Sequence, residues 1–91
     1  MSKFVFHYDA GHGWLEVPMK DLTDLGIADE VSHFSYMRGD RVYLEEDCDY
    51  AIFMKAYKSL CGEYPTVQEV HDGDDSPIRR YARYENRATN P

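Results

Sequence analysis

Three side chains near the N-terminus are of the types that hold metal ions. His7, Asp9 and His12 follow a His-x-Asp-x-x-His spacing, in which a strand-like segment leads into a glycine-rich turn. Imidazoles and carboxylates bind Zn²⁺, Mn²⁺ or Fe²⁺, and three ligands with a vacant position would suit a metal-bound water. Asp9 is equally a good turn residue, and loop geometry alone explains Gly11 and Gly13. A structural turn is therefore our preferred interpretation, and a metal-dependent hydrolase that uses these three residues is the alternative.

Four carboxylates fall within five residues in the middle of the chain. Glu45, Glu46, Asp47 and Asp49 lie where a strand-like segment gives way to a helical one. Acidic residues stabilise the positive N-terminal end of a helix, and one of them can accept hydrogen bonds from the free N–H groups of its first turn. These roles explain two of the four. We predict that the surplus faces solvent and binds Lys or Arg of a partner. The alternatives are a divalent-cation site and a mimic of the row of phosphate charges along a nucleic acid.

Charge is unevenly distributed along the chain. The 91 residues carry 10 Lys and Arg against 17 Asp and Glu, a formal net charge of −7, but residues 76–91 hold four arginines against one glutamate. A negative body repels nucleic-acid phosphates and anionic membranes and attracts basic protein surfaces. We expect Arg79, Arg80 and Arg83 to pair with acidic residues of this chain or of a second copy, which leaves a homodimer open. The sequence thus predicts a protein partner and disfavours direct binding to nucleic acid or membranes.

The cysteines and the N-terminus bear on the compartment. Cys48 and Cys61 are thirteen residues apart on one expected helix. That spacing is about 20 Å at 1.5 Å per residue, whereas a disulfide needs Cα atoms within about 7 Å. Reduced thiols, a first segment without an apolar leader and the lack of a long apolar run predict a cytoplasmic protein. We expect no cofactor, because no phosphate-binding or metal motif of known mechanism is present.

Alternation of apolar and polar residues predicts two hairpins. The expected strands are residues 3–8 with 14–17, and residues 31–37 with 41–45, the second pair joined by a turn at Gly39. Between the hairpins, Pro18 opens a short helix that Gly26 ends.

A longer helix follows at residues 50–61. Its apolar stripe is Tyr50, Phe53, Met54, Tyr57, Leu60 and Cys61. A short strand is expected at 66–71, a basic C-terminal helix at about 76–86 and a frayed tail at 87–91. Residues 1–86 are therefore predicted to form a single acidic α+β domain. In it, a mostly antiparallel sheet of four to five strands packs against one long helix, with two shorter helices.

Two motifs resemble those of a group of small proteins encoded by bacteriophages, prophages and plasmids. They are Asp-Ala-Gly-His-Gly-Trp-Leu-Glu-Val at 9–17 and Tyr-Leu-Glu-Glu-Asp-Cys-Asp at 43–49, with Leu-Gly-Ile at 25–27 between them. The resemblance covers nearly the whole chain. It implies a bacterial cytoplasm and a mobile-element accessory gene, and it transfers no catalytic or binding role to any residue. Small acidic proteins in that context are frequently inhibitors of host or defence machinery, including anti-CRISPR proteins.

The leading hypothesis from the sequence is a non-enzymatic binding module. Its acidic surface, centred on Glu45, Glu46, Asp47 and Asp49, would dock a basic surface of a host or defence protein and inhibit it, with exposed tyrosines as apolar anchors. The alternatives are the metal-dependent hydrolase and a phage structural or assembly protein, which would form a large homo-oligomer.

Overall fold

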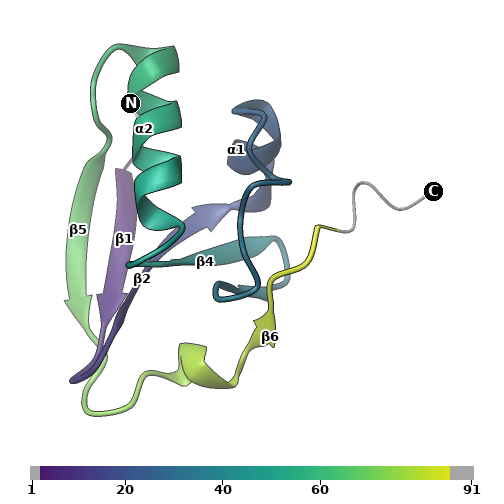
Figure 1. The fold of residues 1–91 in the computed structure, drawn as a ribbon. Helices are drawn as coiled ribbons and strands as arrows, with labels where there is room; N and C mark the ends of the chain where they lie inside the picture. Colours follow the sequence, from purple (N-terminus) through teal and green to yellow (C-terminus); the bar gives the residue numbers. More distant parts are fainter. Residues whose placement is uncertain (1–2, 87–91) are drawn as a thin grey trace.

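A computed structural model of the chain describes residues 3–86, which form a six-stranded sheet with helices on one face (Figure 1). In chain order the elements are β1 (Lys3–Tyr8), β2 (Gly13–Pro18), α1 (Met19–Asp24), β3 (Tyr36–Arg38), β4 (Arg41–Glu45), α2 (Tyr50–Cys61), β5 (Thr66–His71), the 3₁₀ turn η1 (Pro77–Arg80) and β6 (Ala82–Arg83). Among these residues, neither α-helix has the length or the apolar character needed to cross a membrane.

The sheet is mixed, with strand order β5-β1-β2-β4-β3-β6. Every pairing is antiparallel except that of β1 with β5. The parallel pair arises because α2 carries the chain back along the sheet, so that β5 runs beside β1 in the same direction. The predicted α+β class and both predicted hairpins are confirmed, while the expected mostly antiparallel sheet of four to five strands is only partly matched, because the sheet is mixed and has six strands.

The main core lies between the sheet and the helices. Alternate residues of β1, β2 and β4 point to this face, where Phe4 and Phe53 meet edge to face with ring centroids 5.2 Å apart. Its buried members are Phe4, Leu15, Val17, Leu22, Ile27, Val31, Val42, Leu44, Phe53 and Tyr84. Residues 50–61 form the predicted helix, which ends at Gly62 in the left-handed conformation with φ of 84°. Glycine adopts this conformation without steric cost.

A smaller cluster lies on the helix-free face of the sheet. Trp14 and Tyr43 project from β2 and β4, and Ile78 of η1 packs against them, with Tyr36 and Tyr81 at the margin. The segment between β5 and β6 connects the two opposite edges of the sheet and covers this cluster on the way. The C-terminal part of the chain therefore closes the face that the helices leave open.

The predicted C-terminal helix at 76–86 is wrong. Only one 3₁₀ turn forms, opened by Ser76, whose hydroxyl accepts from the Ile78 N–H at 3.2 Å, and β6 then pairs with β3. Ile78 belongs to the cluster on one face of the sheet and Tyr84 to the core on the other, where its hydroxyl donates to the Ala28 carbonyl. An extended chain spans that crossing at about 3.3 Å per residue, against 1.5 Å for a helix. The predicted tail at 87–91 lies outside the described residues.

The predicted strand at 31–37 is also shorter in the structure, where β3 begins at Tyr36. The N–H and hydroxyl of Ser32 and the hydroxyl of Ser35 all donate to the carboxylate of Asp49. Side-chain hydrogen bonds of this kind compete with ladder pairing and hold residues 32–35 as a turn. The alternating pattern of the sequence therefore extends over residues 32–35, but these residues hydrogen-bond to Asp49 and not to a neighbouring strand.

Truncation of Phe53, the central aromatic residue of the core, should destabilise the fold. Phe53 is fully buried, so we expect Phe53→Ala to lower the free energy of unfolding by about 3–5 kcal/mol through lost burial and cavity formation. Leu60 lies on the same helix with 69% of its surface exposed, and Leu60→Ala should change stability by less than about 0.5 kcal/mol. Urea denaturation of both variants measures the difference, and equal effects would contradict the packing described here.

Candidate functional site

Both carboxylate oxygens of Asp9 accept hydrogen bonds that hold the fold together. Its side chain is fully buried and accepts from the backbone N–H groups of Gly11 at 3.0 Å, His12 at 2.9 Å and Ser76 at 2.8 Å. The Arg79 guanidinium adds a bidentate pair, with Nε donating at 2.6 Å and Nη2 at 2.9 Å. Both oxygens are therefore occupied, and Asp9 fastens the β1–β2 turn to the C-terminal segment instead of holding a metal.

This environment keeps Asp9 ionised. The hydrogen bonds from Arg79 lower the pKa of Asp9 far below its ordinary value, overcoming the opposing effect of burial, and the three backbone donors add to the shift. The predicted structural role of Asp9 in the turn agrees with these contacts.

His7 belongs to a different place on the sheet. Its Nε2 lies 2.8 Å from Glu16 Oε1 on β2, and its Nδ1 lies 3.5 Å from Asp72 Oδ2 after β5. Because its two carboxylate neighbours occupy opposite ring nitrogens, they cannot share one ion with it. The structure therefore does not bring His7, Asp9 and His12 together, and the ligand set inferred from their spacing is wrong.

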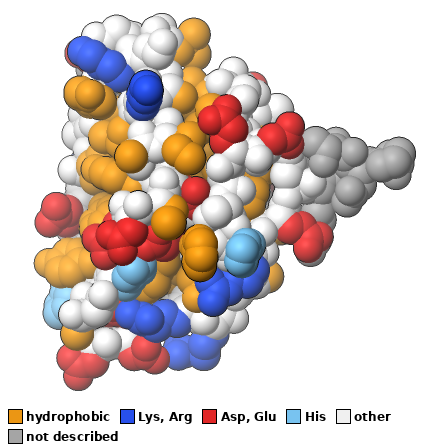
Figure 2. Space-filling view, viewed as in Figure 1, with side chains coloured by type: hydrophobic (Ala, Val, Ile, Leu, Met, Phe, Trp, Pro, Cys, Tyr) orange, Lys and Arg blue, Asp and Glu red, His pale blue; other side chains and the backbone are white. Residues whose placement is uncertain are grey.

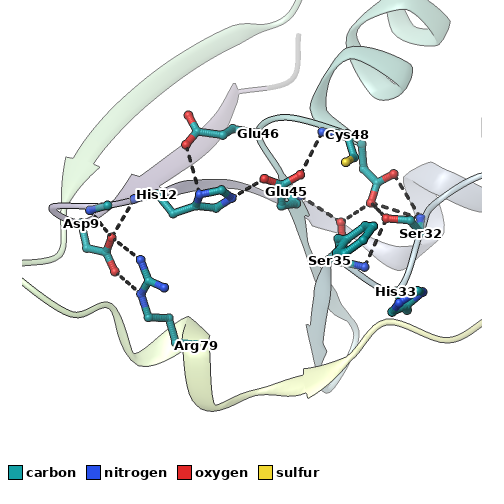
Figure 3. Close-up of polar contacts among 12 residues, drawn as sticks. Asp9, His12, Ser32, His33, Ser35, Glu45, Glu46, Cys48 and Arg79 are labelled. Carbon is teal, nitrogen blue, oxygen red and sulfur yellow. Dashed lines mark hydrogen bonds and ion pairs between the residues drawn. The ribbon is translucent and has the colours of Figure 1, made fainter.

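His12 instead lies between two of the clustered glutamates. Its Nε2 contacts Glu45 Oε2, and its Nδ1 lies 3.7 Å from Glu46 Oε1, so that the ring is held from both sides (Figure 3). The turn fixed by Asp9 sets the backbone of His12, and β4, which pairs with β2, places Glu45 opposite Trp14. A tertiary contact across two strands thus joins the two groups that the sequence presented separately.

Two of the four clustered carboxylates are buried and two are exposed. Glu45 and Asp49 are buried, whereas Glu46 and Asp47 are exposed. Asp49 is not the side-chain cap of α2 that was expected, since its oxygens accept from Ser32 and Ser35. The predicted acidic surface is therefore reduced to Glu46 and Asp47, and their partner role stays a prediction.

Glu45 is held firmly in its buried position. Its Oε1 accepts from the Cys48 N–H at 2.9 Å, and its own N–H donates to the Ser35 hydroxyl at 2.9 Å. Burial by itself would raise the pKa of Glu45, but the hydrogen bonds from Asp47, Cys48 and His12 together lower it below its ordinary value. Glu45 therefore remains a carboxylate at neutral pH.

These groups open into a pocket of about 340 Å³ on the face shown in Figure 2, where acidic side chains gather beside a histidine and basic side chains lie nearby. The pocket is lined by His12, Trp14, Phe34, Tyr36, Glu45, Asp47, Cys48, Arg79 and Arg83. Its volume is at the lower end of the range for small-ligand sites. His12, Glu45 and Asp47 each offer a ligand atom, and these atoms lie within 4.8 Å of one another.

Arginines and aromatic rings form the rest of the lining. The Arg79 guanidinium carbon lies 5.2 Å from the Trp14 ring centroid, and that of Arg83 lies 4.6 Å from the Tyr36 ring centroid. Within residues 3–86, the indole Nε1 of Trp14 is the one buried side-chain polar atom that lacks a hydrogen-bond partner. The sequence analysis missed this lining because Trp14 and Tyr36 belong to strands far apart in the chain and carry no spacing signal.

Cys48 also lines the pocket, but its environment does not favour a nucleophile. The neighbouring Glu45 carboxylate, with some desolvation and the charges of Asp47 and Asp49, raises the pKa of the Cys48 thiol. A reactive cysteine requires the opposite shift, because the thiolate is the nucleophile. The arrangement of imidazole and carboxylates in the pocket is instead suited to holding a cation.

Comparisons with models of known protein families, with curated proteins and with solved structures find no match for this chain. Inferences about function therefore rest on the residues of the pocket.

The Asp9 contacts predict an acid-sensitive stability. We expect Asp9→Asn to lower the free energy of unfolding by about 2–3 kcal/mol at neutral pH, less than for a fully buried pair because the Arg79 side chain is 39% exposed. A depressed folded-state pKa stabilises the fold above the unfolded-state value of about 3.9, and this contribution is lost as the pH falls below it. The wild-type free energy of unfolding should thus fall more steeply than that of Asp9→Asn between about pH 5 and pH 2.

Asp75 provides the matched control. It pairs with Arg79 at 3.3 Å and Arg80 at 3.3 Å, but its side chain is 64% exposed. Asp75→Asn should change stability by less than about 0.5 kcal/mol. Parallel pH profiles for the wild type and Asp9→Asn, measured by urea denaturation, would show that Asp9 is not the group responsible.

Proposed function

We propose that the protein is a metal-dependent hydrolase whose metal ion is bound by His12, Glu45 and Asp47. The observation that carries the proposal is the convergence of one imidazole and two carboxylates at the wall of an open pocket. This keeps the activity class that the sequence offered as an alternative, with a corrected set of ligands of which only His12 is shared. The set matches the one-histidine, mixed-oxygen chemistry that suits Zn²⁺, Mn²⁺ or Fe²⁺.

The spacing of the three groups supports a shared ion. Ligand atoms at about 2.0–2.2 Å from one metal lie no more than about 4.4 Å apart. Separations within 4.8 Å are close to that limit, and Asp47 is exposed and free to adjust its rotamer. A coordinating arrangement needs the Asp47 side chain to move slightly and the direct contact between His12 and Glu45 to be replaced by the ion.

Glu46 supplies a further feature of metal sites. A histidine that binds a metal through one ring nitrogen commonly donates its other N–H to a carboxylate, which fixes the ring and raises its basicity. His12 presents Nε2 to the cluster and has Glu46 3.7 Å from Nδ1. Glu46 is therefore assigned a positioning role behind the ligand.

His12, Glu45 and Asp47 would hold the ion from one side of the pocket. A metal bound there would lower the pKa of a bound water and polarise an oxygen of the substrate. In hydrolysis the water oxygen bonds to the electrophilic centre, the bond to the leaving group breaks, and the leaving group departs with a proton. The volume of the pocket leaves space for a small substrate beside the ligands.

Metal titration tests this assignment. We expect wild-type protein to bind one equivalent of Zn²⁺ or Mn²⁺ in isothermal titration calorimetry, and His12→Ala and Asp47→Asn to weaken binding at least about tenfold through loss of one ligand. Metal-loaded wild type should also release p-nitrophenol from p-nitrophenyl carboxylic and phosphoric esters, and chelation or Asp47→Asn should abolish the release.

His7→Ala is the matched control, because Glu16 and Asp72 lie at opposite ring nitrogens of His7 and cannot converge with it on one ion. It should bind metal as the wild type does. A loss of binding on His7→Ala equal to that on His12→Ala, or an absence of stoichiometric binding, would contradict the site. Metal binding with no turnover of any ester would retain the site and overturn the hydrolase.

A second candidate function is the docking of a basic partner, for which the rim of the same pocket offers support. Glu46 and Asp47 remain exposed, and Phe34, which lines the pocket together with Asp47, has 53% of its surface exposed and supplies an apolar anchor of the kind that interfaces use. In the mobile-element context suggested by the sequence, the partner would be a host or defence protein with a basic surface, which binding would inhibit.

Charge reversal tests the docking function. Glu46→Lys combined with Asp47→Lys should abolish capture of a basic protein from lysate of the bacterial host at physiological salt, because like charges then face each other. Glu63→Lys is the control, since Glu63 is exposed beyond the other end of α2. Undiminished capture by the double variant would reject this surface. A large homo-oligomer in light scattering would instead favour the structural or assembly role.

A further inference from the structure

The pocket has walls of opposite charge. Glu45 and Asp47 lie beside His12, while Arg79 and Arg83 lie on other parts of the lining. The Arg79 charge is already matched by the buried carboxylate of Asp9. The Arg83 charge is not, because no ion pair among residues 3–86 involves Arg83.

Arg83 is nevertheless held in one place. Its guanidinium carbon lies 4.6 Å from the Tyr36 ring centroid, and Nη1 is 3.5 Å from the carbonyl oxygens of His33 and Phe34. These contacts use one face and one nitrogen of the guanidinium. Its remaining N–H groups form a planar fork suited to a carboxylate or phosphate.

Trp14, which also lines the pocket, carries a buried donor without an acceptor in the described part of the chain. Trp14 is 98% buried, since its exposed fraction is 2%, and its Nε1–H has no partner within the described residues. A buried donor without an acceptor costs about 1–3 kcal/mol, so such groups are rare in folded proteins. The Trp14 ring lines the pocket, so its fluorescence can report a bound ligand.

The rim adds an exposed aromatic surface. The His33 and Phe34 rings stack with centroids 4.9 Å apart at an interplanar angle of 25°, and Phe34 lines the pocket with 53% of its surface exposed. Planar heterocycles such as nucleobases stack on exposed rings of this kind. An arginine that forms no ion pair within residues 3–86 and an exposed aromatic surface thus lie at one pocket.

We propose that the pocket binds a nucleoside monophosphate, with the phosphate at Arg83 and the metal ion and the base against Phe34. The proposal rests on the proposed function, because the metal-free carboxylate wall is negative and repels phosphate, whereas a divalent ion reverses the sign of that wall. It also names the substrate class of the hydrolase as phosphoric esters of nucleosides.

Fluorescence of Trp14 tests the proposal directly, because it is the one tryptophan in the chain. Zn²⁺-loaded protein is titrated with AMP, ribose 5-phosphate and adenosine, and the metal-free protein with AMP. We expect AMP to bind about tenfold or more tightly than ribose 5-phosphate. Adenosine, and AMP in the absence of metal, should bind more weakly still.

Two variants test the assigned contacts. Phe34→Ala should remove the advantage of AMP over ribose 5-phosphate, and Arg83→Gln should weaken the binding of both phosphates about tenfold.

Arg80→Gln is the matched control for Arg83→Gln. Arg80 lies three residues away, is 68% exposed and pairs with Asp75 outside the pocket, so its loss should leave AMP binding unchanged. Equal binding of AMP and ribose 5-phosphate, or wild-type affinity in Arg83→Gln, would overturn the proposal. So would AMP binding that is independent of metal. Failure of the protein to bind Zn²⁺ in calorimetry would overturn the proposed function first, whereas Zn²⁺ binding without AMP binding would overturn this inference alone.

Discussion

The buried carboxylate of Asp9 is the constraint on which the rest of the site depends. It holds the backbone of His12 in the β1–β2 turn and fixes Arg79 and Ser76 of the C-terminal segment seventy residues along the chain. Arg79 in turn covers Trp14. Two segments that share no regular pairing therefore meet at one ionised group, and removal of its charge would leave several donors without an acceptor inside the protein.

A second polar network holds the other side of the pocket. Asp49 binds the hydroxyls of Ser32 and Ser35, and Ser35 accepts from the N–H of Glu45. Ser35, Glu45 and Asp49 are buried, so their hydrogen bonds act where the effective dielectric constant is low and are correspondingly strong. This network sets the position of Glu45 against His12, and with it the geometry of the proposed metal site.

The burial of Glu45 and Asp49 changes how the acidic composition is interpreted. A run of carboxylates in a sequence suggests a charged surface, but half of this run satisfies donors from Ser32, Ser35, Cys48 and His12. The net negative charge of the chain therefore overstates the number of carboxylates that face solvent and could bind a partner. A cation in the pocket would complete this local balance of charge, which connects the proposed metal site to the composition of the whole protein.

Local periodicity along the chain was sufficient to predict the two hairpins, the helix at 50–61 with its stop at Gly62, and the α+β class. The sequence also identified His12 and Glu45 as chemically capable residues. It could not place them together, because an antiparallel register between β2 and β4 joins residues thirty-three positions apart. Nor could it predict the C-terminal course, where Ile78 and Tyr84 are buried on opposite faces of the sheet and tertiary burial outweighs helical propensity. Periodicity reports which face of an element is buried, and only the packed fold decides which buried groups meet.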